Sequence, residues 1–196
     1  MFPDLLRARL TGIVDLSPSQ IAALEAHYQL LVRWNESLNL TRVEKLEEVV
    51  ERHYCESVFL AAHLPPGELR IADIGSGAGF PGFPVAIARP ECQITLIESH
   101  QRKAVFLREA SRSLSNVHVL CQRAEMVKET FDHVISRAVS YEDLAKPLKH
   151  IASNVDLLTG SEVPRESMGI EWQPPIPLPW GKQRFLRIGR VVKRGC

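Results

Sequence analysis

Cysteine is scarce in this chain of 196 residues, and its positions are far apart. The four cysteines are Cys55, Cys92, Cys121 and Cys196. They form no CxxC pair and no Cys/His ligand spacing, so the sequence predicts neither a disulfide framework nor a zinc site. Long apolar runs are also missing. The longest stretch without a charged residue, 74–88, has 15 residues that include four glycines and two prolines. It is too short and too interrupted to span a bilayer.

A secretory signal is also missing from the first ten residues. Asp4, Arg7 and Arg9 fall within them, and no apolar segment of signal-peptide type follows. Hydrophobic residues make up 45% of the chain and charged residues 24%, which is typical of a globular protein and argues against disorder. We therefore expect a cytoplasmic protein with reduced cysteines, no membrane association and no bound metal.

Charge is unevenly distributed although the formal net charge is only +1. Residues 1–64 carry 6 basic and 9 acidic side chains, whereas residues 65–196 carry 18 and 14. Residues 181–196 hold six basic side chains and no acidic one. Such a tail attracts polyanions, but it is equally typical of a solvated terminal strand.

The hydrophobic pattern divides the chain at Pro65-Pro66-Gly67. Before it, apolar spacing predicts amphipathic helices over 18–36 and 44–63. After it, short apolar runs alternate with helical patterns, which predicts crossover connections and a parallel sheet. The expected strands are 69–74, 93–97, 117–121, 131–136 and 155–158, the helices 81–88, 100–114 and 141–151, and a last antiparallel strand 184–192. We expect a helical extension at 1–64 and an α/β domain at 65–196.

A glycine-rich segment, 73–82, follows the first expected strand and opens a helix. Glycine lets the backbone turn tightly and approach a ligand closely. Gly77-Ala78-Gly79-Phe80-Pro81-Gly82 fits the G-x-G-x-x-G pattern of dinucleotide-binding proteins. The same segment, from Asp73 through Gly75, Gly77 and Gly79, fits the acid-x-Gly-x-Gly-x-Gly pattern of S-adenosylmethionine loops. Both interpretations place a nucleoside ligand over the carboxyl ends of the strands.

Acidic residues near the strand ends favour the methyl donor. Asp73 can meet a cationic amino-acid tail, whereas it would repel a pyrophosphate. Glu98 ends the next strand and can accept from both ribose hydroxyls, in either kind of ligand. Ala124-Glu125 follows the third strand, where an adenine edge would lie. Each acid has a structural alternative: a capping acid for Asp73, a solvated strand end for Glu98, and a helix N-terminal acid for Glu125.

Beyond the glycine segment, several separate motifs follow one another in order between residues 21 and 186. They are Asn39-Leu40-Thr41, Arg52-His53 with Ser57, 73–84, Glu98-Ser99, Arg102-Lys103, Phe106-Leu107, Arg123-Ala124-Glu125 and Ser136-Arg137-Ala138-Val139. In these motifs the sequence resembles the bacterial ribosomal RNA small-subunit methyltransferase G family, also called the glucose-inhibited division protein B family.

The resemblance implies a class I methyltransferase fold, which is a Rossmann-like, doubly wound and mostly parallel sheet of seven strands with an N-terminal helical extension. It implies transfer of a methyl group from S-adenosylmethionine to N7 of one guanine in 16S ribosomal RNA. Because a protein that binds bare RNA is often more basic than a net charge of +1, we expect the substrate to be an assembled 30S particle. The resemblance also implies that Gly75, Phe80, Ala124, Glu125 and Arg137 adjoin the cofactor. By the same resemblance, Asn39, His53, Arg123 and Arg137 line the guanine side.

Guanine N7 carries a lone pair and no proton, so its methylation needs no general base. We expect catalysis by proximity and orientation, with Arg137 donating to the guanine O6 acceptor. A salt bridge to Asp73 or Glu98 is the structural alternative for Arg137. For Asn39 the alternative is turn formation, and for His53 a hydrogen-bonded core position.

One departure from the family pattern concerns Thr159-Gly160, where the family usually has Lys-Gly. Lys146, Lys149 or Arg165 would have to supply the missing positive charge. Two rival functions remain open. One is an NAD(P)-dependent oxidoreductase that uses 77–82, and the other is a catalytically impaired homologue that retains cofactor or RNA binding.

Overall fold

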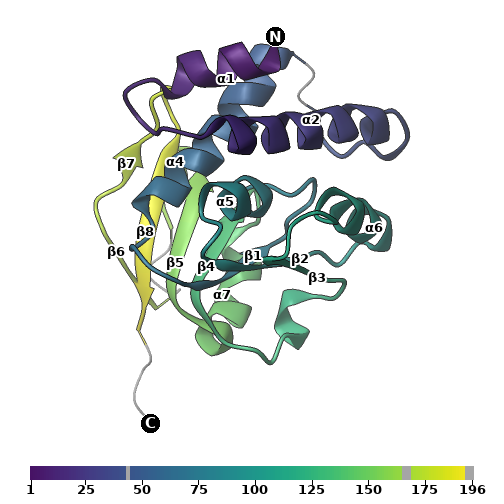
Figure 1. Ribbon diagram of the computed structural model, residues 1–196. Coiled ribbons are helices and arrows are strands. Elements are labelled where there is room, and N and C mark those ends of the chain that lie inside the picture. The colour runs from purple at the N-terminus through teal and green to yellow at the C-terminus, as the bar shows by residue number, and fades with distance from the viewer. Residues whose placement is uncertain (43–44, 165–168, 193–196) are drawn as a thin grey trace.

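The computed structural model describes residues 1–42, 45–164 and 169–192. Its helices and strands alternate after residue 69, as the sequence predicts (Figure 1). Within the described part of the chain, no helix is long and apolar enough to cross a membrane. Arg165, Lys193 and Arg194, which the sequence analysis singled out for their charge, lie outside the described residues.

The N-terminal helices begin with α1 (Phe2–Leu10), which the sequence analysis did not predict. Next comes α2 (Pro18–Leu38), whose start is fixed by a capping box between Ser17 and Gln20. A further helical run covers α3 (Leu46–Val49), the π-helical turn η1 (Val50–Cys55) and α4 (Glu56–His63). The expected helix over 44–63 is thus confirmed from Leu46 onward.

The sheet is formed by strands from the second part of the chain. Their bounds are β1 (Arg70–Ile74), β2 (Gln93–Ile97), β3 (Val117–Leu120), β4 (Phe131–Arg137), β5 (Ala152–Thr159), β6 (Ile170–Trp172), β7 (Ile176–Pro177) and β8 (Phe185–Val191). The order is β3-β2-β1-β4-β5-β8-β6, and β7 pairs with β8. Strands β1 to β5 are parallel, while β8 runs antiparallel to β5. The α/β class is confirmed, and the short β7 adds an eighth strand to the expected seven.

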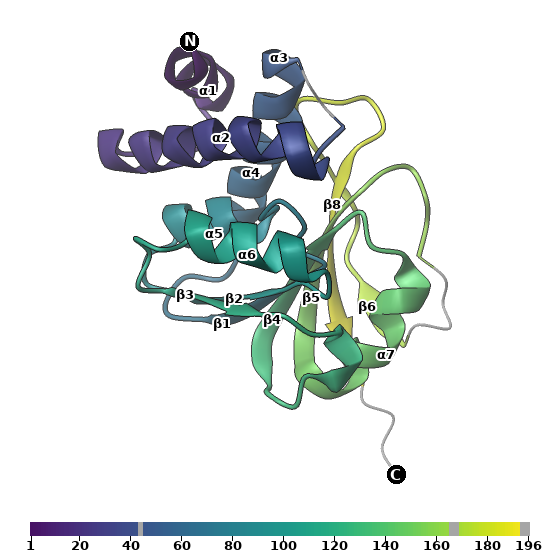
Figure 2. The ribbon, with the colours of Figure 1, turned by 90° about the vertical axis from the view of Figure 1, so that its right-hand side faces the viewer.

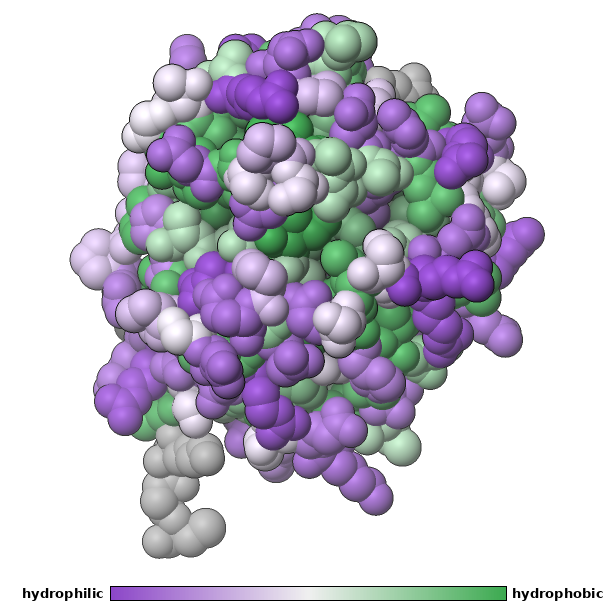
Figure 3. All heavy atoms as spheres, viewed as in Figure 1, coloured by the Kyte–Doolittle hydropathy of each residue, from purple (hydrophilic) through white to green (hydrophobic). Residues whose placement is uncertain are grey.

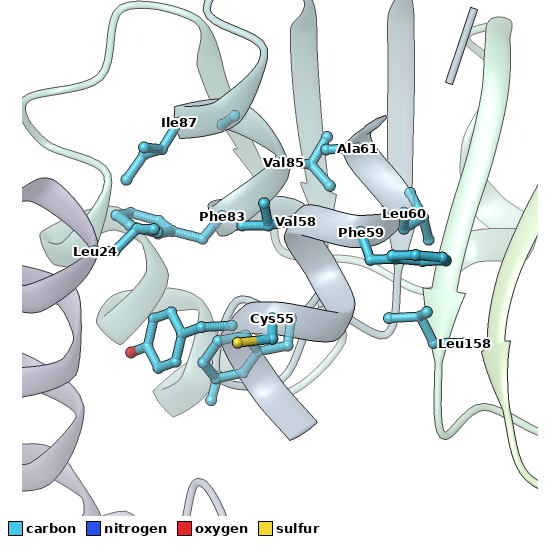
Figure 4. Close-up of a cluster of buried hydrophobic side chains, with 14 of the residues drawn as sticks. Leu24, Cys55, Val58, Phe59, Leu60, Ala61, Phe83, Val85, Ile87 and Leu158 are labelled. Atoms are coloured by element: carbon cyan, nitrogen blue, oxygen red, sulfur yellow. The ribbon is translucent and has the colours of Figure 1, made fainter. Parts of the chain in front are cut away.

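Helices cover both faces of this sheet, as a doubly wound fold requires. On one face lie α5 (Gly82–Ala88), α6 (Gln101–Ala110) and the N-terminal helices, and α7 (Tyr141–Ile151) lies on the other (Figure 2). Side chains from α2, α4, α5 and β5 meet in the larger core, among them Leu24, Val58, Val85 and Leu158 (Figure 4). Outside, hydrophilic residues spread over the face of Figure 1 with smaller apolar patches between them (Figure 3).

The N-terminal helices and the sheet share one continuous hydrophobic cluster. Phe2 of α1 and Leu24 of α2 belong to the same cluster as Phe106 of α6 and Leu186 of β8. The division at residue 64 stays a prediction. The packing shows that the N-terminal helices bury apolar side chains against the sheet domain.

The proline-rich segment before β8 packs against the sheet edge. Both β6 and β7 pair with β8, and Leu178 is buried. The indole N–H of Trp180 donates to the Arg9 carbonyl at 3.3 Å, and its ring meets Phe59 edge-on. These contacts occupy the Trp180 side chain within the fold.

Candidate active site

The glycine segment forms a tight loop between β1 and α5, at the carboxyl ends of the parallel strands. Gly75, Gly77 and Gly79 all have positive φ angles, of 72°, 57° and 91°. A Cβ at Gly75 would lie 2.5 Å from Val139, so that position has no room for one. A Cβ at Gly77 would meet only the Gly75 carbonyl oxygen, at 3.8 Å. Gly77 is therefore the point at which a ligand can approach the backbone most closely.

Asp73 is the second-last residue of β1, just before this loop, and is fully buried. Its Oδ2 accepts the backbone N–H of Gly82 at 2.9 Å, which ties the strand to the start of α5. Within the described residues, the other oxygen, Oδ1, has no hydrogen-bond partner. Burial raises the pKa of Asp73 to about 7, although the bond from Gly82 opposes the shift. Asp73 thus caps α5 through one oxygen, while its other oxygen is buried without a hydrogen-bond partner in the described part of the chain.

Glu98 follows β2 and fixes the loop from the other side. Its two carboxylate oxygens accept the backbone N–H groups of Gly77, at 2.9 Å, and His100, at 2.7 Å. The side chain is buried, so the strand end is not simply solvated. Each carboxylate oxygen can accept a second hydrogen bond, and ribose hydroxyls remain chemically suitable donors.

The residues that follow β3 lie at the same end of the sheet as the loop, past the carboxyl ends of the parallel strands, but at the far edge. Ala124 packs against the smaller hydrophobic cluster and lines a cavity of about 390 Å³ with Pro147 and Ile151 of α7. Arg123 and Glu125 are exposed. Three strand spacings separate β3 from β4 in the sheet order, which amounts to about 14 Å. The structure therefore does not bring Arg123 to Arg137, and its predicted place at the guanine stays a prediction.

Arg137 ends β4 and is held by His53. One guanidinium nitrogen of Arg137 donates to Nδ1 of His53 at 2.5 Å. Because arginine can only donate, Nδ1 must be unprotonated and Nε2 must carry the hydrogen. Nε2 then donates to the Thr41 hydroxyl at 2.8 Å. Burial holds the pKa of His53 at about 3, so the ring is neutral at physiological pH.

Phe80 is buried beneath this pair. The His53 ring stacks on Phe80, with ring centroids 4.7 Å apart and an interplanar angle of 26°. The Phe80 side chain therefore supports His53 from below. Its predicted contact with a cofactor stays a prediction.

A buried ion pair that the sequence analysis missed lies next to Arg137. Glu56 of α4 is fully buried and accepts from two nitrogens of Arg184, which precedes β8. The negative charge of Glu56 favours the charged form of Arg137, while burial lowers the pKa of Arg137 to about 10. One carboxylate thus faces two guanidinium groups. The only signal in the sequence is an acid within the apolar stretch 54–61.

A cavity of about 440 Å³ opens beside these arginines, past the carboxyl ends of β4 and β5. Arg137, Val139, Tyr141, Thr159 and Arg184 are among its lining residues. It adjoins the glycine loop, because Val139 lies against Gly75. Both the loop and the cavity are therefore at one end of the sheet.

Positive charge lies near Thr159 even though this residue is not a lysine. The Arg187 Nε donates to the Thr159 hydroxyl at 3.1 Å, and Arg184 lines the same cavity as Thr159. In contrast, Lys146 and Lys149 line a separate cavity with Glu125. Arg184, which precedes β8, and Arg187 of β8, rather than these lysines, bring positive charge close to Thr159.

Asn39 lies apart from this cavity, at the C-terminal end of α2. It has a left-handed conformation, with φ of 48° and ψ of 50°, as a helix-terminating residue often does. Its side chain lines a groove of about 680 Å³ with Thr41 and Arg42. Thr41 lines this groove and bonds to His53, which holds Arg137, whereas Asn39 shares only the groove with Thr41. The predicted place of Asn39 at the guanine stays a prediction.

These residues fit S-adenosylmethionine. The buried Oδ1 of Asp73 has no partner in the described part of the chain, and a cationic ammonium would supply one. The open backbone at Gly77 and the carboxylate of Glu98 suit a nucleoside. A pyrophosphate in the same place would have to lie near Asp73 and Glu98, which disfavours a dinucleotide.

Known proteins support the same ligand. The family model described as rRNA small subunit methyltransferase G matches residues 20–158. The chain is similar to proteins named ribosomal RNA small subunit methyltransferase G. The relative from Chromobacterium violaceum is 37% identical over 146 residues, covering 72% of this chain and 69% of the relative. The relative from Xanthomonas campestris pv. campestris strain B100 is 42% identical over 143 residues, covering 70% and 66%. The chain thus spans about two thirds of the length of these relatives.

Solved structures share the fold. A SAM-dependent methyltransferase from Aquifex aeolicus has a TM-score of 0.60 at 17% identity, covering 74% of this chain and 93% of that one. Aeropyrum pernix fibrillarin, solved with natively bound S-adenosyl-L-methionine, has a TM-score of 0.55 at 15% identity, covering 69% and 73%. At such identities the likeness concerns the fold alone, which is that of class I methyltransferases. The family match supports the methyl donor over the nicotinamide alternative, and the chain belongs to the rRNA small subunit methyltransferase G family.

Proposed function

We propose that this protein transfers the methyl group of S-adenosylmethionine to N7 of a guanine in small-subunit ribosomal RNA. The observation that carries the proposal is the Arg137 side chain, held by His53 at the end of β4 in a cavity that adjoins the glycine loop. The names of the relatives support the substrate class, and the position of the cavity beside the glycine loop supports binding of both reactants next to each other.

Four residues would hold the cofactor. Asp73 Oδ1 would accept from the ammonium group, Glu98 from the ribose hydroxyls, and Gly77 would let the ligand approach the backbone. Ala124, which follows β3, would adjoin the adenine. Bound S-adenosylmethionine supplies an electrophilic methyl group on a sulfonium. The chain's own task is to orient the guanine toward it.

Arg137 would orient the guanine by donating to O6. The hydrogen bond to His53 occupies one N–H group of Arg137 and restricts rotation of the guanidinium group. The remaining N–H groups therefore point in fixed directions. The bidentate ion pair with Glu56 likewise restrains Arg184, whose positive charge also borders the cavity. Two restrained guanidinium groups suit an acceptor-rich base edge and the RNA phosphates beside it.

No residue in the cavity needs to act as a general base, because N7 has no proton to lose. His53 could not serve as one, since its Nδ1 lone pair already accepts from Arg137. Catalysis would consist of holding N7 about 3 Å from the methyl group in line with the breaking bond. This requires rigid side chains rather than titrating ones.

The assembled 30S particle in the cytoplasm is the substrate that we favour over bare RNA. A net charge of +1 gives little general attraction to polyphosphate, so affinity would have to come from a shaped surface. Arg33, Arg42, Arg102 and Arg123 are exposed and available for phosphate contacts.

The proposal is tested by methyl transfer from labelled S-adenosylmethionine to small subunits purified from a strain that lacks this protein. We expect the label at one guanine as 7-methylguanosine. Label on a protein or a small molecule would refute the substrate. No label at all, with intact nucleoside binding, would identify an impaired homologue.

A further inference from the structure

His27 connects the N-terminal helices to the glycine loop. It lies in the middle of α2 and is buried. Its Nε2 is 3.1 Å from the carbonyl oxygen of Ala78, and its Nδ1 is 2.8 Å from the hydroxyl of Tyr54 in η1. Because a carbonyl can only accept, Nε2 must carry the hydrogen, and Nδ1 then accepts from Tyr54.

The direction of this hydrogen-bonded chain is fixed. Burial holds the pKa of His27 at about 3 and raises the pKa of Tyr54, so the imidazole stays neutral and the hydroxyl stays protonated at physiological pH. Tyr54 therefore donates to His27, and His27 donates to Ala78. Neither bond changes over the pH range in which the protein works.

The position of the imidazole ring is fixed as well. It stacks on Phe83 with ring centroids 4.1 Å apart and an interplanar angle of 23°, and it meets Phe80 edge-on at 5.3 Å. A Cβ at Gly79 would lie only 3.2 Å from its Nε2. The ring therefore has little freedom to move toward the loop or away from it.

The glycine loop needs such a restraint from outside. Ala78 lies between Gly77 and Gly79, which both have positive φ angles. Glycine restricts its own conformation least of all residues, so the sequence of the loop does not by itself select one backbone path. Ala78 is buried, and among the described residues His27 is the donor found for its carbonyl, which would lose this hydrogen bond without the imidazole.

We propose that His27 is a positioning residue for the cofactor: it holds the Ala78 carbonyl inward and so keeps the backbone around Gly77 in the conformation that a nucleoside requires. The inference rests on the proposed function, since it concerns the same loop. It makes the N-terminal helices part of the cofactor site, through one side chain of α2 and one of η1.

The test compares two substitutions of His27. His27→Phe keeps an aromatic ring against Phe83 and removes both hydrogen bonds. We expect at least about tenfold weaker binding of S-adenosylhomocysteine by calorimetry, and faster amide hydrogen exchange across 77–79 in the free protein. His27→Gln places an amide donor near the Ala78 carbonyl, and we expect it to recover part of both losses.

The matched control is Asn116→Ala. Asn116 is buried and donates to the carbonyls of Ala86 and Cys92, so its loss removes two buried hydrogen bonds away from the loop. We expect it to lower the urea midpoint as His27→Phe does but to leave the nucleoside affinity unchanged. Tyr54→Phe retains the imidazole, and we expect a loss of affinity of about threefold, smaller than that of His27→Phe.

Wild-type affinity in His27→Phe, or an equal loss in Asn116→Ala, would overturn the inference. If His27→Phe does not fold, His27→Gln and Tyr54→Phe decide it: full affinity and unchanged exchange in both would overturn it. If the wild-type protein itself does not bind S-adenosylhomocysteine, the proposed function fails. The exchange rates across 77–79 still decide whether His27 orders the loop.

Discussion

Replacing the buried carboxylate at the end of β1 gives the sharpest prediction. Asp73 is fully buried, and its pKa is about 7 in the folded protein against 3.8 in the unfolded chain. Because its pKa is raised, the folded protein binds the proton on this carboxyl more tightly than the unfolded chain does. The resulting stabilisation is complete below the unfolded pKa and is lost as the pH rises through the folded pKa. At high pH the folded protein is therefore destabilised by the ionised Asp73, by about 4 kcal/mol for about three pKa units.

Asp73→Asn removes this ionisation and keeps an acceptor for the Gly82 N–H. The variant's amide group places a buried N–H donor where Oδ1 was. Burying this donor without a partner costs about 1–3 kcal/mol of unfolding free energy, and this cost does not depend on pH. The difference in unfolding free energy between the variant and the wild type should therefore rise with pH. Between about pH 5.5 and about pH 8.5 we expect it to shift by about 2 kcal/mol in favour of the variant.

Urea unfolding of both proteins across this pH range is the assay. A free-energy difference that does not change with pH would show that Asp73 titrates normally and that the burial argument is wrong. The same variant should bind S-adenosylhomocysteine about tenfold to a hundredfold more weakly, because a charge-assisted hydrogen bond to the ammonium is lost. Unchanged affinity would remove Asp73 from the cofactor site.

Three further predictions concern the cavity beside β4. His53→Ala should lower turnover about tenfold or more by releasing Arg137. In the wild type, the ring resonances of His53 should not titrate between about pH 5 and pH 8, and a titration there would contradict a neutral His53. Arg137→Lys should lower turnover nearly as much as Arg137→Ala, because a point charge does not reproduce two directed N–H groups; wild-type rates in Arg137→Lys would argue against orientation. Glu56→Gln should lower the unfolding free energy by roughly 3 kcal/mol because Arg184 loses its buried partner, and urea midpoints equal to those of the wild type would contradict that pairing.

The alternation of strands and helices was predictable because each buried strand is a short apolar run between turn residues. The bounds of β2 and α7 agree with the prediction. In contrast, α1 was not predicted. Its Phe2 packs on the rings of Tyr28 and Tyr54, contacts between segments that the sequence alone does not bring together. Its formation depends on tertiary packing rather than on local pattern.

Strand and helix ends were less predictable. The helix expected over 100–114 ends at Ala110, where Ser111 turns its hydroxyl to the Leu107 carbonyl and the backbone leaves the helix. Local hydrogen bonding by serine competes with helix continuation, and an apolar period does not detect it. The edge strand β6 was missed because its three residues carry no alternating pattern of useful length.

At the candidate site, the sequence predicted which strand ends carry three of the side chains but not which residues these side chains contact. Asp73, Glu98 and Arg137 lie at the ends of neighbouring strands, as the β/α pattern required. The bond of Arg137 to His53 spans 84 positions, and the ion pair of Arg184 with Glu56 spans 128. Such pairs depend on how the N-terminal helices pack over the sheet. No local pattern in the sequence reveals this packing.

Single-turnover methyl transfer to small ribosomal subunits, with wild-type protein and with Arg137→Ala, tests the central claim most directly. We expect label at guanine N7 with the wild type and a rate at least about a hundredfold lower with the variant, while the affinity for S-adenosylhomocysteine changes far less. Label at another atom, or equal rates for the two proteins, would contradict the claim that Arg137 orients a guanine for methylation.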